Sequence, residues 1–411
     1  MNEYNITSLA YYYKHHVSGD DGTNEYFGKD GERTDRMMQN HDALTKFWSA
    51  AERGGGEGGS PSTTSTSGGA SAPPGGDVTG VVLLGMHGVD LADDARLLAT
   101  LQQMHRMDYG AACFLLERIR QIVEALPGGY DNPLLTANAI AIQSADPIDG
   151  RSERDSVIIG DGIYEFIEWL GLGDDGIAYI HSHEFSHHVQ YDLGIGYGSA
   201  ASAVDTAVET RWWEMMADSF GAYFNAHSAG GRMDDAALMN VHRAAFSLGD
   251  CEDAVDSHHG HPRQRECAST YGADLALVSY YNDGHIIPPS VLRELFDEKY
   301  ERMVRLDDEQ CTAVVDESVL DVEIYGEVRD SDTDYSSYFD GFYYHLDHSF
   351  VDEMDKPPPI LQDENGTVMT KVETGFWGGD VQWISEHTSA AGHSDIGFTF
   401  VAPILAYILL R

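Results

Sequence analysis

Two histidines and a glutamate fall within five residues of this chain, in the order His183-Glu184-Phe185-Ser186-His187. Because residues four apart share one face of an α-helix, His183 and His187 can reach the same point if the segment is helical. Two imidazoles at this spacing can hold a Zn²⁺ ion, and Glu184 beside them can take a proton from a water that the metal activates. The motif therefore requires a helix and predicts a zinc site with its own general base.

The residues around the motif favour this helix. Turn-forming residues precede it, and Asp174 or Asp175 is suited to the N-cap and the first turn. Apolar and motif residues then recur at steps of three and four, and Gly194 and Gly196 follow them. We therefore expect a helix that ends before Gly194.

A catalytic zinc site takes three protein ligands and leaves one position for water, so a third ligand is needed. The next long segment without proline, residues 203–226, is rich in Ala, Met, Trp and Phe and is expected to form a mostly buried helix. It contains Glu214 and Asp218, two carboxylates that would repel each other on one helix face. A cation resolves this repulsion, which predicts Glu214 as the third ligand and Asp218 as the acceptor for the far ring nitrogen of a ligand histidine. The alternative is an ordinary Glu and Asp on a solvated face.

A histidine-rich loop follows at residues 257–265. Peptide hydrolysis builds negative charge on a tetrahedral intermediate, and a cationic side chain aimed at that charge stabilises the transition state. His259 and Arg265 are the catalytic candidates for this role, in addition to Glu184. The alternative is a polar loop before a helix, in which Arg265 pairs with a structural carboxylate.

Three other histidines near these segments are not expected to bind the metal. His181 and His188 lie off the face that carries the motif histidines, which predicts a surface or packing role for both. His227 ends the second helix, where a positive charge meets the carbonyl end of the helix dipole favourably.

In their order along the chain, these motifs resemble those of the gluzincin metallopeptidases. They are most similar to the bacterial neutral zinc metallopeptidase family, whose signatures are H-E-x-G-H-H-V-Q and E-L-Q-A-D. The chain has HEFSHHVQ at residues 183–190, EMMAD at 214–218 and H-G-x-P-x-Q-R at 259–265. It departs from the family in Ser186, which replaces Gly, and in Met215-Met216, which replaces Leu-Gln. The last motif also resembles, more distantly, the H-P-x-x-x-x-R spacing of gluzincins like the CAAX prenyl proteases.

The resemblance covers roughly residues 80–280. It implies zinc ligands at His183, His187 and Glu214, with Glu184 as the catalytic base. The expected fold is α+β and mainly helical, a zincin-like metallopeptidase domain with an active-site helix and a second ligand-bearing helix. One Zn²⁺ per chain is expected as the cofactor.

Changes in composition divide the chain into four parts. Residues 1–53 form an N-terminal segment, 54–77 a flexible linker or insertion rich in Gly, Ser and Pro, and 78–288 the zinc metallopeptidase domain. Residues 289–411 form an acidic C-terminal extension with an apolar end. That end, residues 396–410, is shorter than the roughly 20 residues that a membrane-spanning helix needs.

Several secondary-structure elements are expected within these parts. Short buried strands are predicted at residues 81–84 and 157–159, because both runs are apolar. Helical patterns cover Ala43–Ala51, Asp93–Leu126 and Val291–Val304.

The formal charge of −43 limits the partners of this protein. Such acidity opposes binding to nucleic acid and to anionic membrane surfaces. The resemblance to metallopeptidases implies a peptide or protein substrate as the partner. No signal peptide is visible at the N-terminus, which favours the cytoplasm or another soluble compartment. Of the four cysteines, Cys251 and Cys267 bracket the histidine-rich loop and can pair in an oxidising compartment.

The sequence thus predicts a zinc-dependent endopeptidase that hydrolyses peptide bonds through a zinc-activated water, with a Glu as general base. One alternative is a catalytically inactive metallopeptidase-like protein whose metal site has a structural or partner-binding role. Another is a helical interaction module in which the motif match is accidental.

Overall fold

The structure is a computed structural model of the 411-residue chain. It describes residues 14, 22, 25–27, 31–54, 78–103, 107–143, 154–195, 206–250, 259–281, 284–306, 361–362, 368–373 and 381–385. The chain divides into two compact units, Met1–Ser336 with Ile396–Val401 and Ser337–Asp395 with Ala402–Arg411. The predicted motifs all lie in the first unit.

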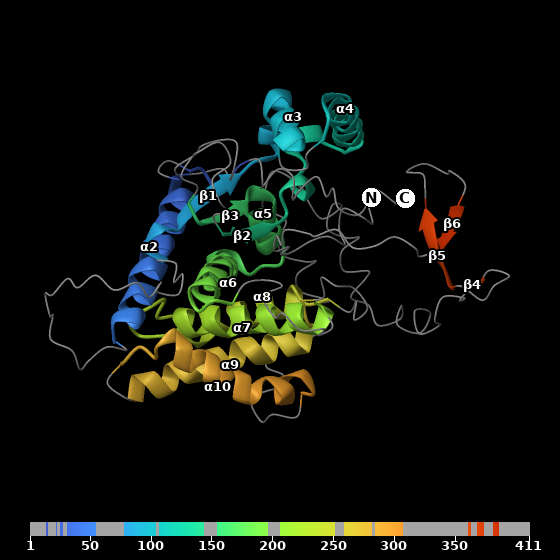
Figure 1. The fold of residues 1–411 in the computed structure, drawn as a ribbon. Coiled ribbons are helices and arrows are strands. Elements are labelled where there is room, and N and C mark those ends of the chain that lie inside the picture. Colours follow the sequence, from blue (N-terminus) through green and yellow to red (C-terminus); the bar gives the residue numbers. More distant parts are fainter. Residues whose placement is uncertain are drawn as a thin grey trace, which may run out of the picture. The chain divides into compact units, whose positions relative to one another are not determined.

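A three-stranded mixed sheet, in the order β1-β3-β2, lies in the first unit (Figure 1). Strand β1 (Val82–Met86) runs parallel to β3 (Ser156–Gly160), and β2 (Ala139–Ile142) runs antiparallel to β3. The strands predicted at residues 81–84 and 157–159 are confirmed as β1 and β3. Strand β2 was not predicted, because it is only four residues long and half of it is Ala, which is depleted in strands.

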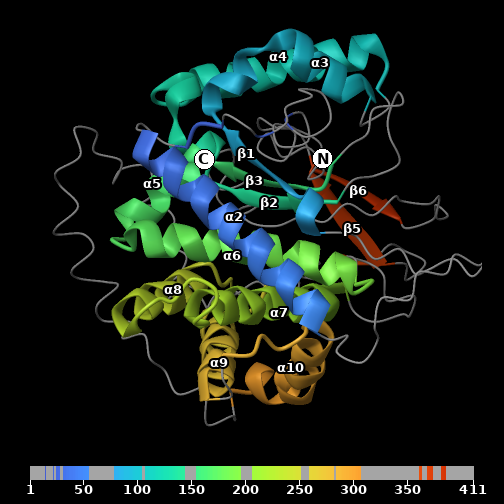
Figure 2. The same ribbon diagram turned by 90° about the vertical axis from the view of Figure 1, so that its left-hand side faces the viewer.

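Helices cover both faces of this sheet (Figures 1 and 2). Helices α3 (Asp94–Gln103) and α4 (Tyr109–Ala125) pack on one face, and α6 (Gly173–Asp192) contacts β2 and β3 on the other. Because successive strand residues point to opposite faces, alternate residues of each strand join the apolar cluster under α3 and α4. Its strand members are Leu84, Met86, Ile140, Ile142 and Ile158.

The other elements described in the first unit are helices and 3₁₀ turns. Its other α-helices are α2 (Gly31–Gly54), α5 (Asp161–Trp169), α7 (Thr206–Ala226), α8 (Asp235–Ser247), α9 (Pro262–Tyr281) and α10 (Pro289–Val304). Short 3₁₀ turns are η1 (Val78–Gly80), η2 (Gly88–Ala92), η3 (Gly129–Asp131) and η4 (Pro133–Leu135). Helix α7 packs between α6 and α9, and α8 contacts α6 and α9. The prediction of a mainly helical α+β fold is confirmed.

Helices α2 and α10 pack on the helices that carry the motifs. Helix α2 is longer than the predicted Ala43–Ala51 and crosses α6 (Figure 2). Its buried residues Leu44, Phe47 and Trp48 form much of its contact surface. Helix α10 corresponds to the pattern predicted at Val291–Val304 and contacts α7 and α9.

The second unit contains an antiparallel sheet of β4 (Leu361–Gln362), β5 (Val368–Glu373) and β6 (Val381–Ser385). The predicted linker beyond Gly54 and the apolar stretch at 396–410 lie outside the described residues. Among the helices that the structure describes, none combines the length and the apolar character needed to cross a membrane.

Helices α7 and α9 approach each other closely at Gly272. A Cβ atom added there would lie 1.9 Å from the Ser219 carbonyl oxygen of α7, which is backbone and cannot turn aside. We expect Gly272→Ala to lower the free energy of unfolding by about 2–3 kcal/mol, because the helices must separate. Gly31→Ala is the control, since a Cβ there meets nothing within 4 Å. Equal unfolding midpoints in urea for both variants would contradict this close packing.

A buried histidine makes stability depend on pH. Burial lowers the pKa of His242 from 6.5 to about 4, and its Nδ1 lies 2.9 Å from Ser269 Oγ. The unfolded state therefore binds more protons between these pH values, so this contribution to stability is complete above about pH 6.5 and is lost as the pH falls. When the pH falls from 7.5 to 5, we expect the free energy of unfolding to decrease by about 2 kcal/mol more in the wild type than in His242→Gln. Urea unfolding at both pH values tests this, with the exposed His285→Gln variant as control; parallel losses in wild type and His242→Gln would refute it.

Candidate metal centre

Helix α6 carries the H-E-x-x-H motif, and the predicted helix is confirmed. It spans Gly173–Asp192 and is followed by Gly194 in the left-handed region, with φ 73°. The N-cap is Leu172, whose side chain makes no capping hydrogen bond, so the N-cap role predicted for Asp174 or Asp175 is wrong. Both aspartates lie in the first turn instead, where negative charge interacts favourably with the helix dipole.

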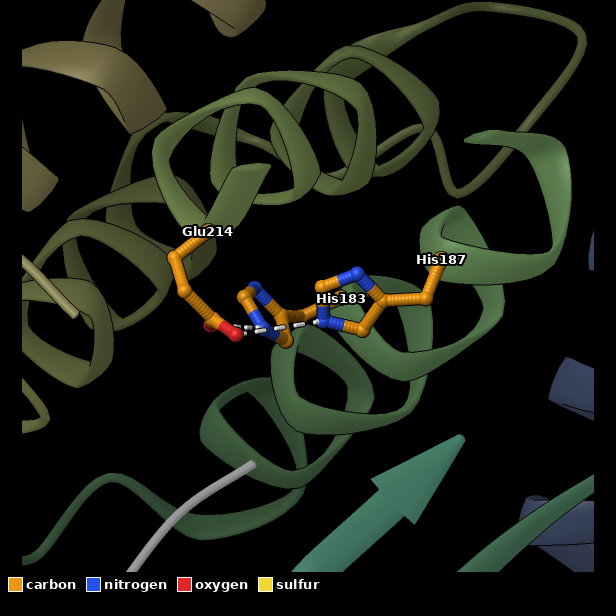
Figure 3. Close-up of side chains that lie close together, drawn as sticks. All are labelled: His183, His187 and Glu214. Carbon is orange, nitrogen blue, oxygen red and sulfur yellow. Dashed lines mark hydrogen bonds and ion pairs between the residues drawn. The ribbon is translucent and has the colours of Figure 1, made fainter. Parts of the chain in front are cut away.

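His183 and His187 of α6 and Glu214 of α7 point toward one another (Figure 3). His183 Nε2 lies 3.1 Å from Glu214 Oε2, and His187 Nε2 lies 3.8 Å from Glu214 Oε1. Each residue offers one ligand atom, and these atoms all lie within 4.8 Å of one another. The structure thus brings together the three residues that the sequence selected as ligands.

The donor set fits a zinc ion. His187 Nε2 and Glu214 Oε1 are buried and have no hydrogen-bond partner, which costs about 1–3 kcal/mol for each atom unless something else satisfies it. Zinc bonds of about 2.0–2.2 Å to nitrogen and oxygen place tetrahedral ligand atoms roughly 3.3 Å apart, close to the 3.1 Å between His183 Nε2 and Glu214 Oε2. Two imidazole nitrogens and a carboxylate are also a ligand set that catalytic zinc sites use.

Asp218, one helical turn after Glu214, collects hydrogen bonds from three side chains. His183 Nδ1 lies 2.8 Å from Oδ1, and Arg265 donates to both oxygens, with Nε–Oδ2 2.8 Å and Nη2–Oδ1 2.7 Å. The Tyr179 hydroxyl donates to Oδ1 as well. The predicted contact between Asp218 and a ligand histidine is therefore present, and that histidine is His183.

Arg265 of α9 is fully buried, and each of its three side-chain nitrogens donates a hydrogen bond. Besides its two bonds to Asp218, its Nη1 donates to the Leu248 carbonyl oxygen at 2.9 Å. This is the pairing with a structural carboxylate that the sequence left open as the alternative. These contacts use three of its five N–H groups, and the catalytic role of Arg265 stays a prediction.

His259 lies just before α9. Its backbone N–H and its Nδ1 lie 2.8 and 3.2 Å from Asp250 Oδ2. Its charge also helps to lower the pKa of Glu214, so it lies within electrostatic range of the ligands. Its assignment as a catalytic residue stays a prediction.

Burial and charge pull the pKa values of the two histidines apart. Burial disfavours the charged form of His183, but hydrogen bonds to Asp218 and Glu214 outweigh it and raise its pKa to about 9. Burial lowers the pKa of His187 to about 3, so this imidazole is neutral. Burial also opposes the charge on Glu214, but His259 and the bond from His183 hold its pKa below the ordinary value.

Glu184 is buried, and the backbone of Ala141 in β2 lies beside its carboxylate and helps to lower its pKa. Burial raises its pKa to about 8; the charge of Glu214 adds to the rise, while His183 and Arg265 oppose it. A carboxyl group held in this way is sensitive to any cation placed beside it. The role of Glu184 as general base stays a prediction.

His181 and His188, for which a surface or packing role was predicted, are both buried and take packing roles. His181 stacks on His41 of α2 at a centroid distance of 5.3 Å, and its Nε2 lies 3.1 Å from His41 Nδ1. His188 Nε2 lies 3.1 Å from the Ser156 carbonyl oxygen of β3. Burial lowers the pKa of His227, so the dipole role that required its charge is not supported.

Sequence reasoning missed two residues that support the ligand histidines, one directly and one through Asp218. Tyr179 bonds Asp218, and Gln190 Oε1 lies 2.8 Å from His187 Nδ1. Tyr179 stands four residues before His183 and Gln190 three residues after His187, so helical spacing was the available signal. Cys267 is disulfide-bonded; Cys251, its predicted partner, lies outside the described residues.

Comparison with known protein families, with curated proteins and with solved structures finds no match to this chain. The resemblance to gluzincins and the zincin-like assignment of the fold therefore stay predictions from the motifs.

Proposed function

We propose that this protein is a zinc-dependent endopeptidase of the gluzincin type, acting on peptide or protein substrates. His183, His187 and Glu214 would hold one zinc ion. When bound, zinc supplies a Lewis acid that polarises a carbonyl group and lowers the pKa of water toward about 7. The observation that carries the proposal is the convergence of ligand atoms from His183, His187 and Glu214, with buried atoms of His187 and Glu214 that have no hydrogen-bond partner.

Glu184 has the properties of the group that moves the proton. It follows His183 directly on α6, and burial raises its pKa to about 8, close to neutral pH. A carboxyl group in this range can accept a proton from the attacking water and then donate it to the leaving amine. Asp218, Arg265 and Tyr179 keep His183 in position while this happens.

One observation favours the alternative of an inactive relative with a structural metal. Glu184, His183, His187 and Glu214 have exposed fractions of 0–1%. A substrate must reach the metal and Glu184, whereas a structural metal site is closed to solvent. An active enzyme therefore requires a movement that opens the site.

Chelation distinguishes the two functions. We expect the wild type to cleave casein or a peptide library, to lose this activity in a chelator and to regain it when Zn²⁺ is added back. The loss is expected because a peptidase needs its metal for chemistry. A protein that binds one zinc per chain and cleaves no member of the library would be the structural alternative.

A further inference from the structure

Gln190 lies in the last turn of α6 and bonds to both helices that carry the ligands. Its Oε1 lies 2.8 Å from His187 Nδ1, and its Nε2 donates to the Trp213 carbonyl oxygen of α7 at 2.8 Å. The side chain is completely buried. Trp213 immediately precedes Glu214, so this one amide connects the second histidine ligand to the residue before the third ligand.

These two contacts determine the tautomer of His187. A carbonyl oxygen only accepts hydrogen bonds, so the NH₂ group of Gln190 must face Trp213. The amide oxygen therefore faces His187, and Nδ1 must be the nitrogen that carries the proton. Nε2 is then left with a free lone pair, and this is the buried atom without a hydrogen-bond partner.

The ring of His187 is also held from its face. The Trp213 indole stacks on it with the centroids 3.7 Å apart and an interplanar angle of 20°. Stacking restricts the tilt of the imidazole, and the bond to Gln190 restricts its rotation in the ring plane. Together they aim Nε2 toward Glu214 Oε1, 3.8 Å away.

We propose that Gln190 is a positioning residue of the metal centre, which fixes the tautomer and orientation of His187 so that Nε2 is presented to zinc. This inference rests on the proposed zinc site. The two histidines are thus held differently, His183 by the Asp218 carboxylate and His187 by a neutral amide. An amide adds no charge to a centre that already contains Glu184, Glu214 and Asp218.

The test compares zinc affinity in matched variants, measured by competition with a chromophoric chelator. Gln190→Met keeps the side-chain length and removes the acceptor, and we expect zinc binding about 10–100-fold weaker than in the wild type. Asn225→Leu is the control, because Asn225 Nδ2 donates to Ser182 Oγ at 2.9 Å and so links α7 to α6 without touching a ligand. Its zinc affinity should remain close to that of the wild type, even where its unfolding midpoint falls.

Equal zinc affinity in Gln190→Met and the wild type would overturn the inference but not the proposed zinc site. Equal weakening of zinc binding in Gln190→Met and Asn225→Leu would overturn it in the same way. Failure of the wild type to bind zinc would instead refute the proposed function. A second measurement needs no variant: ¹⁵N NMR of the imidazole nitrogens in the metal-free wild type should show His187 protonated at Nδ1. Protonation at Nε2 would overturn the inference whether or not the variants fold.

Discussion

Replacing Glu184 by Gln reduces the rate of peptide hydrolysis by about 10²–10⁴-fold, the usual contribution of a positioned general base. The amide has nearly the same shape as the carboxylate but cannot take up a proton from water. Glu184 is not among the three residues whose ligand atoms converge, so we expect the variant to retain its zinc. Because the amide oxygen can still accept from the backbone of Ala141, stability should also be kept.

Activity on casein or a peptide library and zinc content by elemental analysis are measured on the same sample. Glu124→Gln, on the exposed side of α4, is the control and should change neither quantity. Undiminished cleavage by Glu184→Gln would show that another group moves the proton. Loss of zinc together with activity would show that Glu184 acts on the metal site rather than on the water.

Replacing Arg265 by Met destabilises the protein by about 3–5 kcal/mol, because it leaves the buried Asp218 carboxylate without its compensating charge. Both side chains have an exposed fraction of 0% and are joined by two hydrogen bonds. The charge of Arg265 is the main influence that holds the pKa of Asp218 well below its usual range against the effect of burial. The free energy of unfolding in urea, measured without metal, gives the change.

The control is another Arg–Asp pair that lies at the surface. Arg293 and Asp297 of α10 are 3.5 Å apart with side chains about 40% exposed, so Arg293→Met should cost at most about 1 kcal/mol. A similar small cost for Arg265→Met would show that the buried pair is not what anchors Asp218. If that variant also lost activity while keeping full stability, the catalytic role first predicted for Arg265 would be supported.

Local spacing is what made the centre predictable from the sequence. His183 and His187 are four residues apart, as are Glu214 and Asp218, so helix geometry alone places each pair on one face. The buried carboxylates of α7 required a cation, and the His pair of α6 required a third ligand. The predicted metal site meets both requirements, which is why the two segments could be paired from the sequence.

Contacts across the fold could not be predicted in the same way. The partner of Arg265 depends on how α9 packs against α7, where Gly272 allows the close approach. The stacking of His181 on His41 depends on α2 crossing α6, about 140 residues away along the chain. Strand β2 depends on pairing with β3, because the run Ala-Ile-Ala-Ile has no strong preference of its own.

The number of zinc ions bound per chain tests the central claim most directly. Protein purified under metal control is dialysed against a fixed concentration of free Zn²⁺, and zinc and protein are then quantified. The proposed centre predicts about one zinc per wild-type chain and close to none in the variants His183→Ala, His187→Ala and Glu214→Ala, since each lacks one of the three ligands. Zinc well below one per wild-type chain, or one zinc retained in all three variants, would contradict it.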